Sequence, residues 1–303
     1  MARLHPGKYA ERPAAPLSLI GGRRIAHARW PLCRKRIALR DAPAITGRTG
    51  EAVRSTSLVQ ECSCRAWLAP VHAALCREHD LRMGHLPPKI AAERRELVRR
   101  GYDLISRAYR SDDGASNPTT AETTETYTAW LEELAGYLGP GAEVLDIGCG
   151  AGVPADRWLA DAGFRLTGID ISEVQIERAR RLVPSATFVR ADIAVFDAAD
   201  ASFDAVVSFY ALIHVPLEDQ RALFPRIHRW LRPGGLFLAI VGNERWTAVE
   251  DYHGAPMFWD HADTRTYLRW LAADGFAVQW SRFVPEGSGG HGLVMARKPV
   301  TRL

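Results

Sequence analysis

The chain has 303 residues, of which 47% are apolar and 24% are charged, and its formal net charge is +4. These values are ordinary for a soluble globular protein, and no run approaches the roughly 18 apolar residues that a membrane-spanning helix needs. We therefore expect no membrane partner. Because the five cysteines show no pattern of a disulfide framework, we expect a cytoplasmic location.

The net charge is distributed unevenly along the chain. Residues 1–100 contain 20 Lys or Arg and eight Asp or Glu, a net charge of +12. Residues 101–303 contain 19 Lys or Arg and 27 Asp or Glu, a net charge of −8. Since proteins that bind nucleic acid usually carry a basic face, nucleic acid is an unlikely partner of the acidic C-terminal part.

Residues 1–85 are predicted to form a basic, poorly ordered extension ahead of a folded domain at residues 86–303. The extension is rich in Pro, Gly, Ala and Arg and shows no sustained helical or strand periodicity; a transit peptide would have a similar composition. Soft metal ligands gather near its end, at Cys62, Cys64, Cys76 and His79. The first two cysteines are too close together for a typical zinc site, so we predict no metal. A second hypothesis is that Met83 is the native start and that the upstream residues are a translated leader.

Two helices are predicted before the first strand. Apolar residues at helical spacing mark residues 89–110 and again residues 124–138. The sequence Gly139-Pro140-Gly141 then ends the second helix.

The central motif is a buried strand, residues 144–147, followed by Gly148-Cys149-Gly150-Ala151-Gly152 and a helix at residues 153–162. Glycines allow positive φ and a close approach of a ligand to the backbone. In open α/β sheets, ligands bind at such loops, at the carboxyl ends of parallel strands. A dinucleotide would require a glycine at Val153, whereas the carboxylate of Asp146 favours a ligand that carries an ammonium group and no phosphate.

Further strands and helices alternate after this motif. The next strand, residues 165–170, ends at Asp170, which lies 22 residues after Gly148 and suits a ribose diol. The other expected strands are residues 187–190, 202–210, 236–241, 277–284 and 291–297, and the expected helices include residues 173–182 and 217–231. Residues 243–263 lack a period and are rich in aromatic residues, which is typical of a lid or binding loop.

These motifs resemble, in order, those of the class I S-adenosylmethionine-dependent methyltransferases. The resemblance covers residues 88–298 and is nearest to the small-molecule, ubiquinone- and menaquinone-type group. It implies an α/β fold: a Rossmann-like three-layer sandwich with a seven-stranded, mostly parallel sheet, an antiparallel last strand and an N-terminal helical cap. It also implies methyl transfer from S-adenosylmethionine to an oxygen or nitrogen atom of a small-molecule acceptor, with carbon as a further option.

The resemblance carries a set of expected cofactor contacts. In the family, the aspartate after the third strand accepts the adenine amino group and its apolar neighbour covers the ring, while a cap tyrosine lies over the cofactor. The residues expected to bind the cofactor are Tyr109, Asp146, Gly148, Cys149, Gly150, Gly152, Asp170, Ile171, Asp192, Ile193 and Phe209.

A hydroxyl acceptor would benefit from a general base, and histidine is the usual choice near neutral pH. The candidates are His214, His261 and His291, of which His214 is best placed, just after the fourth strand. Two other functions stay open at this point. One is a nucleic-acid or protein methyltransferase that uses the basic extension, and the other is a non-catalytic module that binds the cofactor.

Overall fold

The computed structural model describes residues 88–113 and 124–300. The predicted extension lies outside the described residues, and so do the candidate zinc ligands and Met83.

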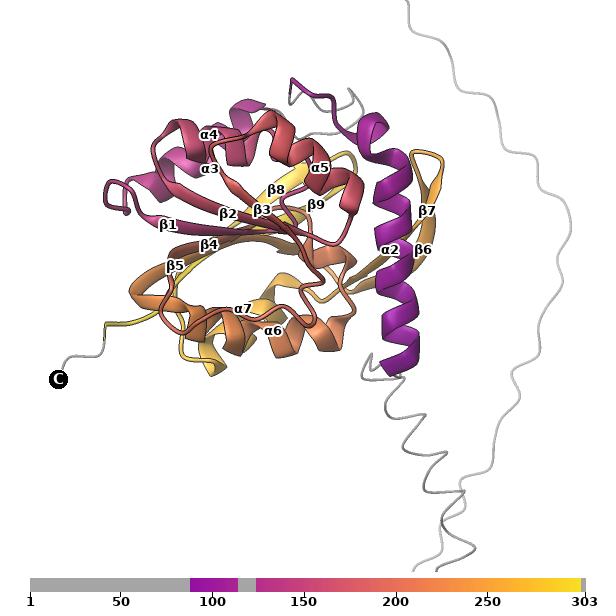
Figure 1. Cartoon of the computed structure of the whole chain (residues 1–303). Helices are drawn as coiled ribbons and strands as arrows, with labels where there is room; N and C mark the ends of the chain where they lie inside the picture. The colour runs from indigo at the N-terminus through magenta and orange to yellow at the C-terminus, as the bar shows by residue number, and fades with distance from the viewer. Residues whose placement is uncertain (1–87, 114–123, 301–303) are drawn as a thin grey trace, which may run out of the picture. The chain divides into compact units, whose positions relative to one another are not determined.

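A seven-stranded sheet forms the centre of the described part of the chain (Figure 1). Its strand order is β3-β2-β1-β4-β5-β9-β8, and only β9 runs antiparallel to its neighbours. The strands are β1 (Glu143–Ile147), β2 (Arg165–Asp170), β3 (Thr187–Arg190), β4 (Phe203–Ser208), β5 (Leu231–Gly242), β8 (Ala277–Glu286) and β9 (Gly289–Arg297). This topology confirms the predicted fold class, including the antiparallel last strand.

Helices cover both faces of the sheet (Figure 1). On one face lie α3 (Thr124–Ala135), α4 (Ala155–Asp161) and α5 (Glu173–Leu182), and on the other lie α6 (Leu217–Trp230) and α7 (Thr264–Ala273). Successive strand residues point to opposite faces, so Val144 packs with the α3 and α4 side while Leu145 packs with the α6 and α7 side. Burial on both faces explains why the strands read as nearly continuous apolar runs.

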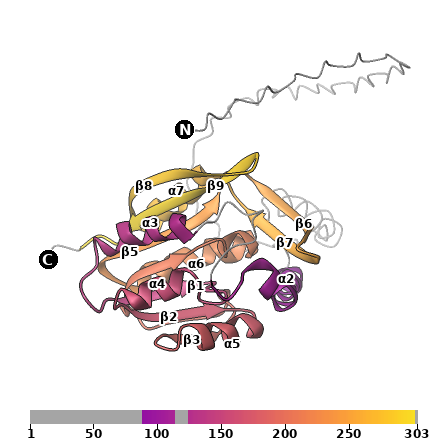
Figure 2. The ribbon, with the colours of Figure 1, turned by 90° about the horizontal axis from the view of Figure 1, so that it is seen from above.

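The first described helix, α2 (Pro88–Tyr109), lies beside a small second sheet, as both views show (Figure 1, Figure 2). That sheet pairs β6 (Trp246–Tyr252) with β7 (Ala255–His261) in antiparallel register. Val98 and Ile105 of α2 pack against Met257 and Phe258 of β7. Gly101 permits this approach, because a Cβ at that position would lie 2.7 Å from the Met257 side chain.

The prediction of an irregular loop over residues 243–263 was therefore wrong, since most of this stretch is a β-hairpin. Its turn is formed by His253 and Gly254, both with positive φ (54° and 88°). Two positive φ values in a two-residue loop are the geometry that matches the twist of a hairpin. The sequence lacks the Asn-Gly or Asp-Gly pair that usually signals such a turn.

The C-terminal end of α2 is held by a buried arginine of α5. Arg178 donates hydrogen bonds to the carbonyl oxygens of Ser106 (2.5 Å) and Arg110 (2.8 Å) and forms an ion pair with Asp112 (2.7 Å). The last carbonyls of a helix have no partner within the helix, so the guanidinium supplies one. This contact fixes the part of α2 that carries Tyr109.

Within the ranges that the structure covers, none of the helices is both long and apolar enough to cross a membrane.

Candidate active site

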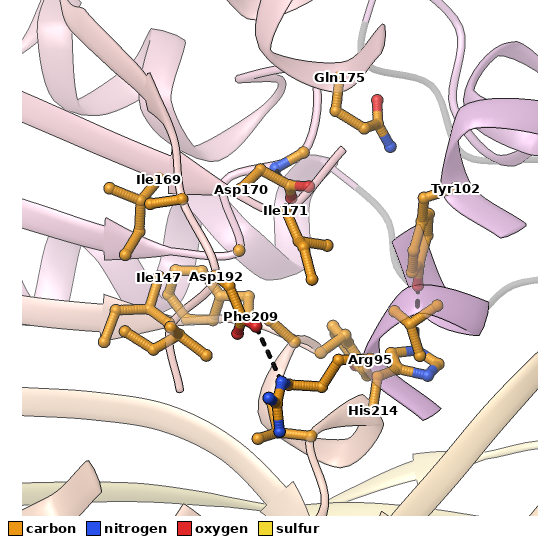
Figure 3. A pocket seen from close by; sticks show the side chains of 18 of the residues that line it. Arg95, Tyr102, Ile147, Ile169, Asp170, Ile171, Gln175, Asp192, Phe209 and His214 are labelled. Atoms are coloured by element: carbon orange, nitrogen blue, oxygen red, sulfur yellow. Dashed lines mark hydrogen bonds and ion pairs between the residues drawn. The ribbon is translucent and has the colours of Figure 1, made fainter. Parts of the chain in front are cut away.

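A cavity opens at the carboxyl ends of β1, β2 and β4, under α2 (Figure 3). The empty space between its lining atoms, including the part open to solvent, is about 750 Å³, which is in the range of small-molecule sites. Its position outside the strand ends is where open α/β sheets bind ligands. The lining includes Arg95, Tyr102, Tyr109, Gly148, Gly150, Asp170, Ile171, Gln175, Asp192, Ile193, Phe209, Tyr210 and His214.

The glycine loop after β1 forms one wall of this cavity. Gly148 has a φ of 77°, and a Cβ there would lie 2.1 Å from the Cβ of Ala211, so only glycine fits. Gly150 has a φ of 55°, but a Cβ there would meet nothing closer than the Gln175 side-chain nitrogen at 3.8 Å. The loop thus packs tightly at Gly148 and leaves room for a ligand at Gly150.

Gly152, which the sequence predicts to contact the cofactor, is packed against neighbouring side chains. A Cβ at this position would meet Phe188, Val183 and Ala179 at 3.2–3.4 Å, and Gly152 lines neither of the cavities described here. Its glycine is required by the packing of the loop over β3 and α5. Cys149 is buried, and burial raises the pKa of its thiol well above the ordinary value, so it stays a protonated loop residue.

Asp170 ends β2 with both carboxylate oxygens oriented by backbone amides. Oδ1 accepts a hydrogen bond from the Ser172 amide (2.8 Å) and Oδ2 accepts one from the Gly150 amide (3.0 Å). Burial raises the pKa of Asp170 to about 6, against the lowering effect of these amides. Each oxygen retains acceptor capacity for a hydroxyl group of a ligand.

Asp192 lies opposite Asp170 in the cavity and is joined to the cap helix. Nε of Arg95 donates to Asp192 at 2.8 Å (Figure 3). Another guanidinium nitrogen of Arg95 lies 2.5 Å from Asp219. Arg95 was not among the residues predicted from the sequence. Nothing in the local pattern could have singled it out, because α2 carries several arginines at similar positions.

His214 and Tyr102 meet at the far end of the cavity. The Tyr102 hydroxyl lies 2.9 Å from Nε2 of His214, and Nδ1 of His214 lies 2.7 Å from the carbonyl oxygen of Phe258 (Figure 3). A carbonyl only accepts hydrogen bonds, so Nδ1 carries the hydrogen and Nε2 accepts from the tyrosine. Burial lowers the pKa of His214 to about 4, so the ring is neutral near pH 7.

His261 and His291 lie outside this cavity. Nδ1 of His261 donates to the carbonyl oxygen of Glu244 at 2.7 Å, and the His261 ring packs where a Cβ of Gly242 would be. His291 lies 3.1 Å from Glu286, behind Tyr210. The geometry therefore selects His214 from the three candidate bases.

A smaller cavity of about 410 Å³ adjoins the larger one on the other side of the loop. The two share Tyr109, Gly148, Gly150, Gln175 and Phe209 as lining residues. The smaller cavity is also lined by Asp146, which is 3% exposed, and by Arg110, whose guanidinium lies over the rings of Tyr109 and Tyr127. A buried carboxylate and a buried guanidinium in one cavity suit the two charges of an amino acid.

The stretch that contains these motifs matches a known protein family. A family model described as "Methyltransferase domain" matches residues 144–235, which run from β1 into β5 and include the glycine loop, Asp170 and Asp192. Residues 144–235 are therefore similar to a methyltransferase domain.

Two curated relatives are similar to about half of this chain. The sterol 24-C-methyltransferase of Yarrowia lipolytica is 30% identical over 169 residues, covering 52% of this chain and 43% of that protein. The 2-methyl-6-phytyl-1,4-hydroquinone methyltransferase of Synechocystis is 35% identical over 144 residues, covering 46% of this chain and 43% of that protein. The chain thus spans less than half the length of these relatives.

The fold of the methyltransferase domain is also found in solved structures. The 1,6-didemethyltoxoflavin-N1-methyltransferase of Burkholderia thailandensis, solved with S-adenosylhomocysteine, aligns with a TM-score of 0.54 and 22% identity, over 71% of this chain and 91% of that one. At this level of identity the likeness concerns the fold.

Proposed function

We propose that the chain transfers the methyl group of S-adenosylmethionine to a small, largely apolar acceptor. One observation carries the proposal: two carboxylates, Asp146 and Asp170, flank the glycine loop, one in each of the two adjoining cavities. A dinucleotide would place its pyrophosphate at this loop, between two negative side chains. A nucleoside that carries an ammonium group instead finds a carboxylate for its diol and another for its positive charge.

The residues present fit this cofactor. Asp170 would accept hydrogen bonds from the ribose hydroxyls, and Ile171 and Ile193 would flank the adenine. Asp192 would accept from the adenine amino group in competition with Arg95. In the smaller cavity, Asp146 would bind the ammonium group and Arg110 the carboxylate. When bound, the sulfonium supplies an electrophilic methyl group, so the chain has no need to activate the donor.

The chain's own contribution is to orient the acceptor and to remove its proton. Val98 of α2 and Phe209 contribute apolar surface to the lining of the cavity, and this surface would limit the access of water to the reacting atoms. A hydroxyl acceptor could donate to the oxygen of Tyr102, whose own hydrogen points to Nε2 of His214. The acceptor proton would pass to the oxygen of Tyr102, and the tyrosine proton would pass to Nε2 of His214.

The cavity and the names of two relatives support a proposal for the class of acceptor. The lining is mainly apolar and aromatic, and the two curated relatives are named for a sterol and a hydroquinone. Because the Tyr102–His214 pair can accept a proton, a phenolic hydroxyl is the first acceptor to test. Carbon is the second, since one relative is a 24-C-methyltransferase.

The test uses the full-length chain and titration calorimetry with S-adenosylmethionine. We expect binding that Asp170→Ala weakens at least about tenfold, from the loss of hydrogen bonds to the diol, and that Asp161→Ala, an exposed aspartate of α4, leaves unchanged. Formation of S-adenosylhomocysteine is then followed with hydroquinones, phenols, sterols and amines. Binding of NAD in place of S-adenosylmethionine would refute the proposal, and binding without turnover on any acceptor would favour the non-catalytic alternative.

The nucleic-acid alternative depends on the basic extension, which lies outside the described residues. It predicts RNA binding with a steep dependence on salt, so RNA is included in the acceptor screen at two salt concentrations. A cytoplasmic location remains part of the proposal and rests on the absence of a disulfide pattern in the sequence.

A further inference from the structure

Next to the glycine loop, two carboxyl groups are buried together, and neither forms an ion pair within the described residues. Asp146 on β1 is 3% exposed and Asp156 in the first turn of α4 is 0% exposed. Oδ1 of Asp146 and both oxygens of Asp156 are buried with no ordinary hydrogen-bond donor, although the two side chains lie within hydrogen-bonding reach of each other. Among the residues that the structure describes, neither carboxyl has an ion pair with Lys, Arg or His.

Two adjacent buried carboxyls cannot both be ionised at low cost, so they share a proton. Of the groups that face the pair, the carboxylate of Asp170 adds to this effect and the guanidinium of Arg110 opposes it. Asp170 from β2 and the thiol of Cys149 lie nearby, and the cap contributes Tyr109, Arg110 and Tyr127 to the cavity that Asp146 lines. Burial, the largest effect, and the charge of Asp170 raise the pKa of Asp146 to about 7, while Asp156 is raised well above its ordinary value.

We propose that Asp156 stays protonated and donates to Asp146, and that the ammonium group of the cofactor replaces a second proton on this pair when it binds. Binding of S-adenosylmethionine then releases a proton, whereas binding of its nucleoside part alone does not. The inference rests on the proposed function and assigns to Asp156 a positioning role: it holds the Asp146 carboxylate ready for a cation.

The direction of the pH dependence follows from this exchange. The cationic ligand binds best to ionised Asp146. Its affinity is therefore highest at pH values above the pKa of Asp146 in the ligand-free chain. As pH falls through about 7, the proton must first be removed, and affinity falls by up to about tenfold per pH unit. The amino group of the ligand stays protonated in this range, because an α-amino group titrates near pH 8, about 7.7–8.0.

The experiment is titration calorimetry of the full-length chain at pH 6.5 in two buffers of different ionisation enthalpy, which counts the protons released. S-adenosylmethionine is compared with 5′-methylthioadenosine, which keeps the adenine and the ribose but lacks the ammonium group. We expect a difference of between about half and one proton per bound ligand, given the pKa near 7. The comparison cancels any proton exchanged at Asp170, since both ligands carry the ribose.

Three variants test whether Asp146 and Asp156 cause the difference in proton release. Asp146→Asn should abolish the difference between the two ligands. Asp156→Ala removes the donor to Asp146 and should move the pH at which affinity is half lost upward by about one unit, while Asp156→Asn, which keeps a donor, should restore it. An unmoved midpoint in Asp156→Ala would show that Asp156 only fills space.

The outcomes also separate this inference from the proposed function. Equal proton release with both ligands would overturn the exchange while leaving the cofactor assignment standing. Binding of neither ligand would overturn both.

Discussion

The hydroxyl of Tyr102 on α2 and Nε2 of His214 after β4 are 2.9 Å apart, although 112 residues separate them in the sequence. The contact joins the cap helix to the tip of the central sheet. Nδ1 of His214 is already committed to the carbonyl oxygen of Phe258, so the ring presents only Nε2 to the cavity, and it does so through the tyrosine.

This relationship predicts that Tyr102→Phe lowers kcat more than it changes cofactor binding. Removal of the hydroxyl breaks the path of the proton, and loss of one acid–base group costs on the order of 100-fold. The measurement is S-adenosylhomocysteine formation with a phenolic acceptor, alongside calorimetry of the cofactor. Tyr137→Phe, at an exposed tyrosine beyond α3, is the matched control. An unchanged kcat in Tyr102→Phe would remove the pair from the mechanism.

The contacts of Arg95 predict that the stability of the cap helix α2 depends on the end of the cavity that carries Asp192. In Arg95→Ala, Asp192 and Asp219 lose their shared cation, which is about one-sixth exposed (17%), so α2 should lose on the order of 1 kcal/mol of local stability. Hydrogen exchange should increase in α2 and stay unchanged in β1 and β4. Arg100→Ala serves as the control, since Arg100 is exposed and its ion pair within the described residues is with Glu96 of the same helix. Equal exchange in both variants would contradict the link.

Gly148 in the glycine loop and Gly163 after α4 are expected to lose different amounts of stability when they are replaced by alanine. Gly148→Ala combines a positive φ with a clash at 2.1 Å, whereas Gly163→Ala has a φ of 85° with nothing within 4 Å of the new Cβ. The backbone alone costs about 1–2 kcal/mol in Gly163→Ala, and the clash should add about 1–3 kcal/mol in Gly148→Ala. Chemical denaturation of both variants measures the difference in the free energy of unfolding. Equal losses would show that Ala211 moves aside.

The buried acidic pair predicts a pH dependence of stability in the ligand-free chain. The pKa of Asp146 is about 7 in the folded chain, against about 3.9 when unfolded. The proton on Asp146 stabilises the folded chain at low pH. This contribution to the free energy of unfolding is lost as the pH rises from 5.5 through about 7, by on the order of 2 kcal/mol. Unfolding free energies at pH 5.5 and pH 8 should therefore differ less in Asp146→Asn than in the unaltered chain, and an identical difference would contradict this.

The sequence predicted those parts of the site that lie on contiguous segments. Asp146, Gly148 and Gly150 follow one strand, and Asp170 and Asp192 each end another, so the alternation of apolar runs and turns was sufficient to place them. The parallel arrangement then brings the strand ends together without further information. These are the parts in which local pattern and global fold agree.

The parts that the sequence did not predict depend on contacts between distant segments. Arg95 resembles its neighbouring arginines on α2 until Asp192 and Asp219 are placed beneath it. Asp156 has the pattern of a solvated residue in the first turn of a helix, yet it is buried and lies within hydrogen-bonding reach of Asp146. Gly152 shows the reverse case, since a glycine within a ligand-binding motif serves the packing of Phe188.

The position of β9 has a consequence for the synthesis of the protein. β9 is the last strand in the sequence, yet it lies between β5 and β8 in the sheet. While the ribosome is still translating residues 289–297, β8 has no partner strand and β5 exposes the backbone groups of one whole edge. The nascent chain therefore carries an open sheet edge until β9 has been synthesised, and the glycine loop can fold before the sheet is complete.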